Sequence, residues 1–404
     1  MPNCNPQNTI KLPSYVDGKI SSHQMKILLV GEYSNVHWTL AQALRSLGHK
    51  VTVVSGGDCW KNYPRDINVS HRLTPLGHMA FLMRLIKALP YMRGYDIVQL
   101  INPVFFEMRP WPHRYIFNYL RRHNGHVILG AFGMDHYWVQ VNKDLRPMRY
   151  SDFNIGNQTR TDAVAQADID IWIGTDAEHL CRYVAQNSDA IVAGLYEYWL
   201  TYQFAEEGSL KQKTHYISFP IEMPSQQAVP SQHTSTNASL LPLKIFVGIS
   251  KNRSAYKGTD IMLHAAQRLK EQYPQQVELL VAEGVPFAKY QEMMNGSDLI
   301  LDQLYSYTPA MNALLAMSKG IICVGGGEPE HYDLLGENEL RPIINVLPNE
   351  QSVYDALENL VLHPELIPKL KEESIAYVAR HHNPTSIARQ YEKLYISIIN
   401  KHNQ

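Results

Sequence analysis

The stretch QLYSYTPAMNALLAMSKGIICVGGGEPE, residues 303–330, decides the fold that we expect for this chain. It has the pattern of a strand end, a loop, a capped helix, a second strand and a glycine-rich turn. Thr308 is a favoured helix N-cap, and Pro309 suits the first helical position because that position needs no N–H donor. A helix that begins at the carboxyl end of a strand directs free N–H groups towards a phosphate. The stretch therefore predicts an anion site beginning at Thr308.

The length and composition of the chain indicate a globular protein with two domains. The 404 residues can form two separate cores, and hydrophobic residues make up 45% of them. Lys and Arg number 37 against 38 Asp and Glu, with no basic tract, so we do not expect nucleic acid as a partner. The four cysteines are scattered, which gives no zinc-ligand pair and fits a reducing, cytoplasmic compartment.

Two polar segments mark the expected domain boundaries. Residues 1–24 lack the apolar core of a signal peptide and are predicted to be a disordered leader. Residues 224–243 are rich in Ser, Gln, Thr and Pro, a composition that predicts a linker or loop. The regular pattern of strands and helices begins at residue 25 and starts again at residue 244.

Apolar strand segments alternate with helical segments on both sides of this linker. Such alternation predicts an α/β fold with two doubly wound, Rossmann-like domains, at residues 25–223 and 244–383, that face a cleft. Apolar residues spaced by three and four predict a closing helix within residues 384–404. The predicted strands are 26–30, 51–54, 96–101, 126–131, 169–173, 189–193, 244–248, 277–282, 298–302, 321–324 and 342–346, and the predicted helices include 39–47, 113–123, 260–272, 288–295 and 309–319.

Motifs in the second half of the chain resemble those of the retaining GT-B glycosyltransferases, in particular glycosyltransferase family 4 of bacterial polysaccharide assembly. FVGISKNRSAYKGTDI (246–261) resembles the first strand and loop of the donor domain of that family. AMSKGIICV (316–324) resembles Ala-Met-Ala-x-Gly-x-Pro-Val-Val, and GGEPE (326–330) resembles Gly-Gly-x-Pro-Glu. The resemblance extends over nearly all of residues 25–400.

This resemblance implies a GT-B architecture and a reaction. The domain at 25–223 would bind the acceptor, the domain at 244–383 would bind the nucleotide sugar, and the helix at 384–404 would cross back to the first domain. The implied reaction is transfer of a hexose from a nucleoside-diphosphate sugar to a glycan or lipid-linked acceptor, with retained configuration. No cofactor and no metal are expected, and contact with the inner membrane is left open.

The resemblance also implies which residues form the site. Arg253 and Lys257 match a basic pair beside the diphosphate, and preorganised cations suit stabilisation of a leaving diphosphate. Asp135 follows an apolar strand directly, so we place it with this pair as a catalytic candidate. The donor-binding candidates are Gly248, Thr308, Pro309, Met311, Asn312 and Glu330, and the acceptor-side candidates are Ser34, Asn35, His37 and His136.

The chain departs from the family pattern at two acidic positions. The family usually carries two glutamates eight residues apart around the donor-side helix, and the corresponding residues here are Tyr307 and Leu315. Asn312 could supply a neutral hydrogen-bonding group in place of one glutamate. Two alternatives therefore stay open: an inactive GT-B protein that binds a nucleotide sugar or partners a true transferase, and a GT-B nucleotide-sugar epimerase.

Overall fold

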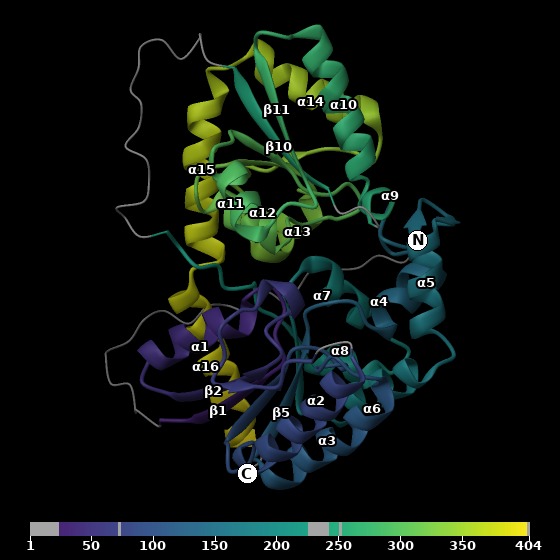
Figure 1. Cartoon of the computed structure of the whole chain (residues 1–404), viewed down its shortest axis with the longest axis vertical. Helices are drawn as coiled ribbons and strands as arrows, with labels where there is room; N and C mark the ends of the chain where they lie inside the picture. The colour runs from purple at the N-terminus through teal and green to yellow at the C-terminus, as the bar shows by residue number, and fades with distance from the viewer. Residues whose placement is uncertain (1–23, 72–73, 225–241, 250–252, 402–404) are drawn as a thin grey trace.

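The computed structural model describes residues 24–71, 74–224, 242–249 and 253–401, which form two bodies stacked along the long axis of the molecule (Figure 1). Each body has a parallel sheet between layers of helices. This arrangement confirms the predicted α/β class with two Rossmann-like bodies. Except for Gln24, the predicted leader lies outside the described residues, as do residues 225–241 of the predicted linker.

The N-terminal body, residues 24–219 together with α16 (Pro384–Lys401), is built around a parallel sheet. Within the described residues this sheet has seven strands in the order β3-β2-β1-β4-β5-β8-β9. The order reverses between β1 and β4, and such a reversal leaves a crevice at the carboxyl ends of the strands. The strands are β1 (Lys26–Val30), β2 (Lys50–Ser55), β3 (Ile67–Asn68), β4 (Ile97–Leu100), β5 (His126–Ala131), β8 (Ala190–Ala193) and β9 (Thr214–Tyr216), and β6 (Asn154–Ile155) pairs with β7 (Gln158–Thr159) in a separate hairpin.

Helices cover both faces of this sheet, and one of them corrects the sequence analysis. The strand predicted over residues 169–173 is wrong, because residues 169–172 complete helix α5 (Ala163–Trp172) and Ile173 follows its end. The Asp162 side chain accepts a hydrogen bond from Ala165 N and caps the helix. The alanine-rich first turn favours the helix, and this preference outweighs the strand preference of the β-branched residues that follow. The other helices are α1 (Val36–Ser46), α2 (Pro75–Ala88), α3 (Pro110–His123), α4 (His136–Gln140), α6 (Asp176–Asn187), α7 (Tyr196–Gln203) and α8 (Gly208–Lys213).

The C-terminal body, residues 221–381, has a smaller parallel sheet with the order β11-β10-β12-β13-β14. Its central strands are apolar on both faces because helices pack on each side. The strands predicted in this region are confirmed, with boundaries that differ by one or two residues. The elements are β10 (Leu243–Ile249), α9 (Ser254–Lys257), α10 (Thr259–Gln272), β11 (Val277–Glu283), α11 (Phe287–Asn295), β12 (Leu299–Leu301), α12 (Met311–Met317), β13 (Ile322–Gly325), α13 (Pro329–Leu335), β14 (Ile344–Asn345), α14 (Glu350–Leu362) and α15 (Leu366–His381).

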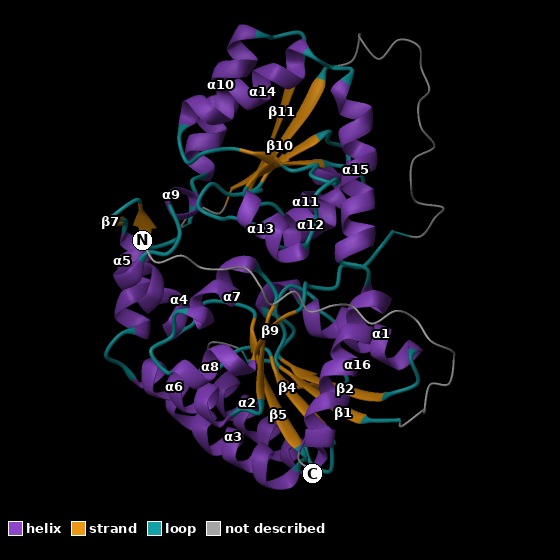
Figure 2. Ribbon diagram, turned by 180° about the vertical axis from the view of Figure 1, so that it is seen from behind, coloured by secondary structure: helices purple, strands orange, loops and turns teal. Residues whose placement is uncertain are grey.

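The chain passes between the bodies at two places that lie side by side. In the first, Phe219 is buried in the N-terminal core and Ile221 in a C-terminal core cluster. In the second, α15 of the C-terminal body leads into α16, which packs against α1 in the N-terminal body (Figure 2). His382 links the two crossings, since its carbonyl accepts from Ile221 N at 2.9 Å and its Nδ1 lies 2.9 Å from Phe219 O.

The apolar face of α16 is part of the N-terminal core. Tyr391 and Tyr395 are fully buried, and the Tyr395 hydroxyl donates to Gln99 Oε1 at 2.8 Å. The amphipathic helix predicted for this segment is confirmed. Within the described residues, no helix has both the length and the apolar character needed to cross a bilayer.

We expect the N-terminal body to depend on this helix for stability. Tyr395→Ala should lower the free energy of unfolding by about 3–5 kcal/mol, the usual loss for a large buried aromatic side chain. Tyr395→Phe removes only the hydrogen bond to Gln99 and should cost about 1 kcal/mol. Urea unfolding followed by circular dichroism measures both values. Ile396, which is 39% exposed on the same helix, provides the control: Ile396→Ala should change stability by less than Tyr395→Ala, and equal losses would contradict the role of the buried ring.

Candidate functional site

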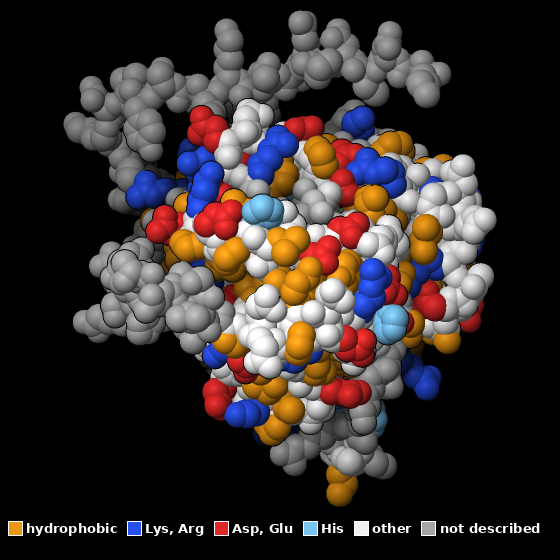
Figure 3. All heavy atoms as spheres, turned by 90° about the horizontal axis from the view of Figure 1, so that it is seen from above, with side chains coloured by type: hydrophobic (Ala, Val, Ile, Leu, Met, Phe, Trp, Pro, Cys, Tyr) orange, Lys and Arg blue, Asp and Glu red, His pale blue; other side chains and the backbone are white. Residues whose placement is uncertain are grey.

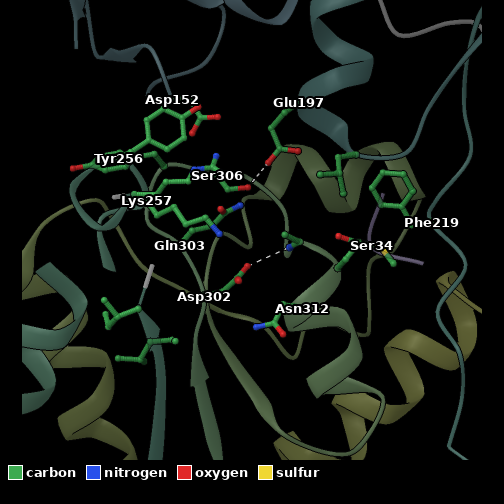
Figure 4. Close-up of a pocket in the computed structure, with 18 of the residues that line it drawn as sticks. Ser34, Asp152, Glu197, Phe219, Tyr256, Lys257, Asp302, Gln303, Ser306 and Asn312 are labelled. Atoms are coloured by element: carbon green, nitrogen blue, oxygen red, sulfur yellow. Dashed lines mark hydrogen bonds between the residues drawn. The ribbon is translucent and has the colours of Figure 1, made fainter. Parts of the chain in front are cut away.

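A cavity of about 870 Å³ lies between the two bodies (Figure 4). The N-terminal body contributes Ser34 and Lys61, and the C-terminal body contributes Lys257 and Asn312. These residues follow or flank the carboxyl ends of strands in their respective sheets. The cavity is therefore in the place where open parallel sheets bind ligands.

Three cations reach this cavity. Lys257 is the last residue of α9, and Arg253 precedes the same helix by one residue. Lys61 comes from the opposite body, where its Nζ donates to Asp58 at 2.7 Å and to the Ser34 hydroxyl at 3.1 Å. Burial lowers the pKa of Lys257, Asp302 opposes that shift, and the nearby charge of Arg253 reinforces it. A bound anion would relieve the mutual repulsion of these cations.

Two carboxylates lie next to the cations. Asp302 follows β12 and accepts a hydrogen bond from Ala310 N at 3.2 Å. Burial raises the pKa of Asp302, and the adjacent Lys257 opposes the increase. Asp152 lies on the N-terminal side, where Trp138 Nε1 donates to it at 3.3 Å, and burial raises its pKa as well. Figure 4 shows Lys257 and Gln303 side by side above Asp302, with Asp152 next to the Tyr256 ring.

The Glu197 carboxylate of α7 joins the two bodies at the edge of the cavity. Its Oε1 accepts from the Ser306 hydroxyl at 2.6 Å and from the N–H groups of Tyr307 and Thr308 at 2.7 and 2.8 Å. Its Oε2 accepts from the Thr308 hydroxyl at 2.7 Å. Burial raises the pKa of Glu197, and these hydrogen bonds oppose the rise because they favour the charged form. The donors of the loop at 306–308 are thus occupied by a carboxyl side chain of the protein itself.

This contact corrects the predicted start of the donor-side helix. α12 begins at Met311, so Thr308 is not its N-cap and Pro309 is not its first residue. Thr308 donates hydrogen bonds to Glu197 from both its hydroxyl and its N–H. The Asp302 side chain accepts from the N–H of Ala310, the residue before the helix. Met311 and Asn312 at the new start of the helix line the cavity.

Gly248 at the end of β10 allows the close approach of an aromatic side chain. A Cβ atom at this position would lie 2.6 Å from the Tyr290 hydroxyl oxygen, which is shorter than any normal contact. The Tyr290 hydroxyl in turn accepts from Asn312 Nδ2 at 2.7 Å, and burial raises the pKa of Tyr290 to about 12. Gly248, Tyr290 and Asn312 therefore form one wall of the cavity.

Glu330 lies in a second contact between the bodies. Arg149 of the N-terminal body forms ion pairs with Glu330 at 2.5 Å and with Glu328 at 2.6 Å. Burial alone would raise the pKa of Glu330, but the hydrogen bond from Arg149 lowers it overall. The Tyr307 ring, at one of the two positions where the resembling family has glutamate, stacks on Tyr196 with ring centroids 5.8 Å apart.

Asp135 and His136 lie in the interior of the N-terminal body. Asp135 caps α4 by accepting from Trp138 N at 2.9 Å, and it also accepts from the Tyr202 hydroxyl at 2.7 Å. His136 Nδ1 lies 3.0 Å from Trp172 O. Both side chains are about 1% exposed, so the structure places them within the packing of the helices.

Glu32 caps α1 in the loop that follows β1. Its two carboxylate oxygens accept from the N–H groups of His37, at 3.2 Å, and Trp38, at 2.9 Å. Burial raises the pKa of Glu32 to about 8. Asn35 takes the left-handed conformation before α1, with φ of 69°, and the His37 ring is buried with Nδ1 2.8 Å from Gly31 O.

The structure brings together about half of the predicted site residues. Those that line the cavity are Ser34, Gly248, Arg253, Lys257, Met311 and Asn312, and those that lie elsewhere are Asn35, His37, Asp135, His136, Thr308, Pro309 and Glu330. Lys61, Asp152, Glu197 and Asp302 also line the cavity and were not predicted from the sequence. Asp302 could have been found because it ends a predicted strand, whereas no local pattern distinguishes the other three. In the described part of the chain, no three His, Cys, Asp or Glu side chains are grouped so that they could hold a metal ion.

Comparison with known proteins shows what this fold is. No protein-family model and no curated protein sequence matches the chain. Among solved structures, HepE from Anabaena in complex with UDP and glucose is 13% identical with a TM-score of 0.55, covering 93% of this chain and 100% of the other. Sucrose-phosphate synthase from Thermosynechococcus elongatus is 14% identical with a TM-score of 0.57, covering 94% and 100%.

A plant enzyme shares the same fold. The catalytic domain of starch synthase IV from Arabidopsis thaliana, bound to ADP and acarbose, is 12% identical with a TM-score of 0.56, covering 93% of this chain and 99% of the other. Identities this low show the fold alone. The predicted GT-B architecture is confirmed.

The raised pKa of Glu32 predicts a pH dependence of stability. Between its ordinary pKa of 4.5 and the raised pKa of about 8, the folded state keeps a proton that the unfolded state releases, so this group stabilises the fold less as the pH rises. Glu32→Gln removes the dependence. The stability of the native protein relative to Glu32→Gln should therefore fall by about 1.4 kcal/mol per pH unit between pH 5 and pH 8. Urea unfolding at pH 5, 6.5 and 8 measures it, with the exposed Glu206→Gln as the control. If the stability difference between the native protein and Glu32→Gln did not change with pH, the raised pKa of Glu32 would be contradicted.

Removing the Glu197 carboxylate should uncouple the two bodies. Glu197→Ala removes the acceptor of four buried donor groups, two hydroxyls and two N–H groups, and should lower stability by about 3 kcal/mol or more. In scanning calorimetry we expect the unfolding endotherm to separate into two transitions. Glu197→Gln retains one acceptor oxygen and should keep a single transition. If Glu197→Ala unfolds like Glu206→Ala, in which an exposed carboxylate is lost, the contact does not couple the bodies.

Proposed function

We propose that this protein is a glycosyltransferase that transfers a hexose from a nucleoside-diphosphate sugar to a glycan or lipid-linked acceptor. One observation carries the proposal: Arg253 and Lys257, the predicted diphosphate pair, line the same cavity between the bodies as Met311 and Asn312. The GT-B fold supports it, and so do the UDP, UDP-glucose and ADP present in structures that share the fold.

In this proposal the donor diphosphate lies against the cations of the C-terminal body. Arg253 and Lys257 would stabilise the charge that develops on the leaving diphosphate, and Lys61 would add a third positive charge from the other body. The side chains of Asn312 and Tyr290 offer neutral hydrogen-bonding groups for the sugar or the nucleoside. The acceptor would enter from the N-terminal side, near Ser34.

The finer points of the proposal come from the family resemblance. We propose that the anomeric configuration is retained and that no metal takes part, with these side-chain cations balancing the diphosphate charge. We also propose a role in bacterial polysaccharide assembly, in the cytoplasm at the inner membrane. The donor-binding role of the C-terminal body and the acceptor-binding role of the N-terminal body belong to the same proposal.

A second candidate function is binding of a nucleotide sugar without transfer. It is favoured by the position of Tyr307, which takes the place of one family glutamate and is buried between the bodies, where it stacks on Tyr196. Leu315 takes the place of the other glutamate, so neither position can supply a carboxylate to the donor. Assays with a panel of donor sugars separate the two functions: binding without turnover would establish the second.

Lys257 provides the mutational test of the proposed function. Lys257→Ala should reduce turnover by roughly 10²-fold, which is the usual loss when one preorganised charge donor is removed from a transition state. Steady-state kinetics measures this, and the unfolding temperature reports whether the fold is retained. Lys289→Ala, which removes an exposed lysine of α11, is the matched control. Unchanged turnover in a folded Lys257→Ala protein would remove the diphosphate assignment.

Ligand binding can be tested before the acceptor is known. A ligand that binds only the folded protein raises its unfolding temperature. We expect one of UDP, GDP, ADP and TDP to raise the unfolding temperature of the native protein, and to do so less in Lys257→Ala. If none of the four changes it at millimolar concentration, the cavity is not a nucleotide site and both candidate functions fail.

A further inference from the structure

Helix α2 presents a row of large apolar side chains to the solvent. Four exposed apolar residues, at positions 76, 79, 83 and 86, are spaced by three, four and three residues. This spacing places them on one side of an α-helix. The exposed residues of this row are Leu76 (80%), Met79 (61%), Met83 (54%) and Ile86 (67%), and Leu82 beside them is 52% exposed.

The opposite face of α2 is apolar too. Phe81, Leu85 and Ala88 are buried in the N-terminal core, so the helix already contributes its inner face to the fold. A helix that is apolar on both faces is normally covered on both. A contiguous exposed apolar face of this kind marks a surface that binds something else.

Aromatic side chains extend this apolar surface. Tyr91 follows the end of α2 and is 69% exposed, and Trp111 and Tyr115 on α3 are 57% and 71% exposed. The Tyr119 hydroxyl of α3 donates to Leu89 O at 2.9 Å and so ties α3 to the end of α2. Trp and Tyr are the side chains that favour the boundary between lipid and water.

The two segments that form this surface carry charged side chains of one sign. Residues 74–93 and 108–125 contain seven Lys and Arg and no Asp or Glu, in a protein whose total charge is −1. Two of these cations, Arg84 and Arg121, donate to the neutral oxygens Ser70 O and Asn187 Oδ1. In contrast, the end of the C-terminal body seen in Figure 3 has cations and anions intermixed.

The surface lies away from the cavity. α2 and α3 lie in the half of the N-terminal body that is more distant from the C-terminal body (Figures 1 and 2). A partner that covers them would therefore leave the space between the two bodies accessible.

We propose that the outer face of α2, together with Tyr91, Trp111 and Tyr115, docks on an anionic lipid surface. The apolar row would enter the boundary between headgroups and acyl chains, and the surrounding Lys and Arg would neutralise lipid phosphates. A second copy of this chain fits less well, because a symmetric dimer through this face would bring the same set of cations together. The proposal does not depend on sugar transfer, since lipid binding can be measured with no donor present.

Sedimentation with vesicles tests the proposal directly. The full chain should bind vesicles of phosphatidylglycerol and phosphatidylcholine at least tenfold more tightly than vesicles of phosphatidylcholine alone, and 0.5 M salt should weaken this binding. A variant with Leu76→Ser, Met79→Gln, Met83→Gln and Ile86→Ser should bind at least tenfold more weakly. Because these four side chains are exposed, its unfolding temperature should match that of the native protein. The control variant, Leu347→Ser with Leu362→Ser, removes exposed apolar residues of the C-terminal body and should leave vesicle binding unchanged.

Tryptophan fluorescence gives a second readout. The emission of the native protein should shift to shorter wavelength with anionic vesicles, and Trp111→Phe should reduce the shift while binding continues. The proposal is overturned if the native protein fails to bind anionic vesicles, or if the four-residue variant binds them as well as the native protein does. A concentration-dependent dimer that this variant abolishes, without any vesicle binding, would assign the surface to a second copy instead.

Discussion

Burial of the Glu197 carboxylate between the two bodies is the interaction on which the geometry of the cavity depends. Taking a carboxylate out of water costs several kcal/mol unless its oxygens find donors. The segment at 306–308 offers two hydroxyls and two N–H groups, all within 2.8 Å. The same segment leads directly to Asn312, while Asp302 lies just before it. A single buried carboxyl group therefore positions the C-terminal side of the cavity relative to the N-terminal body.

A common theme appears where the two bodies face each other. In each body, a carboxyl side chain of the protein itself accepts from two backbone N–H groups: Glu32 at the start of α1 and Glu197 at the loop before α12. The cations Lys61, Arg253 and Lys257 then remain as the principal groups for an anionic ligand. Side-chain cations can follow a ligand through a change of its position, whereas backbone N–H groups are fixed with the fold. The site thus relies on adaptable charges more than on a rigid amide cradle.

Much of the fold could be predicted from the sequence, because apolar strands buried on both faces leave a strong local pattern. Arg253 and Lys257 were predicted from the family resemblance of the loop that follows one such strand. The helical structure of residues 169–172 could not be predicted. Their β-branched side chains suggested a strand, whereas the cap at Asp162 and the preceding alanines favour a helix. The role of Thr308 was also misjudged. Its partner, Glu197, is 111 residues away in the sequence, and only the docking of one folded body on the other brings them together.

The paired crossings of the chain have a mechanical consequence. Two covalent connections, at Phe219–Ile221 and around His382, lie together at one edge of the molecule and are hydrogen-bonded to each other. Sliding one body over the other would strain both connections at once, whereas swinging about the line through them strains neither. The softest internal motion is therefore a hinge rotation at this edge, and it would widen or narrow the side where Lys61 and Lys257 face each other.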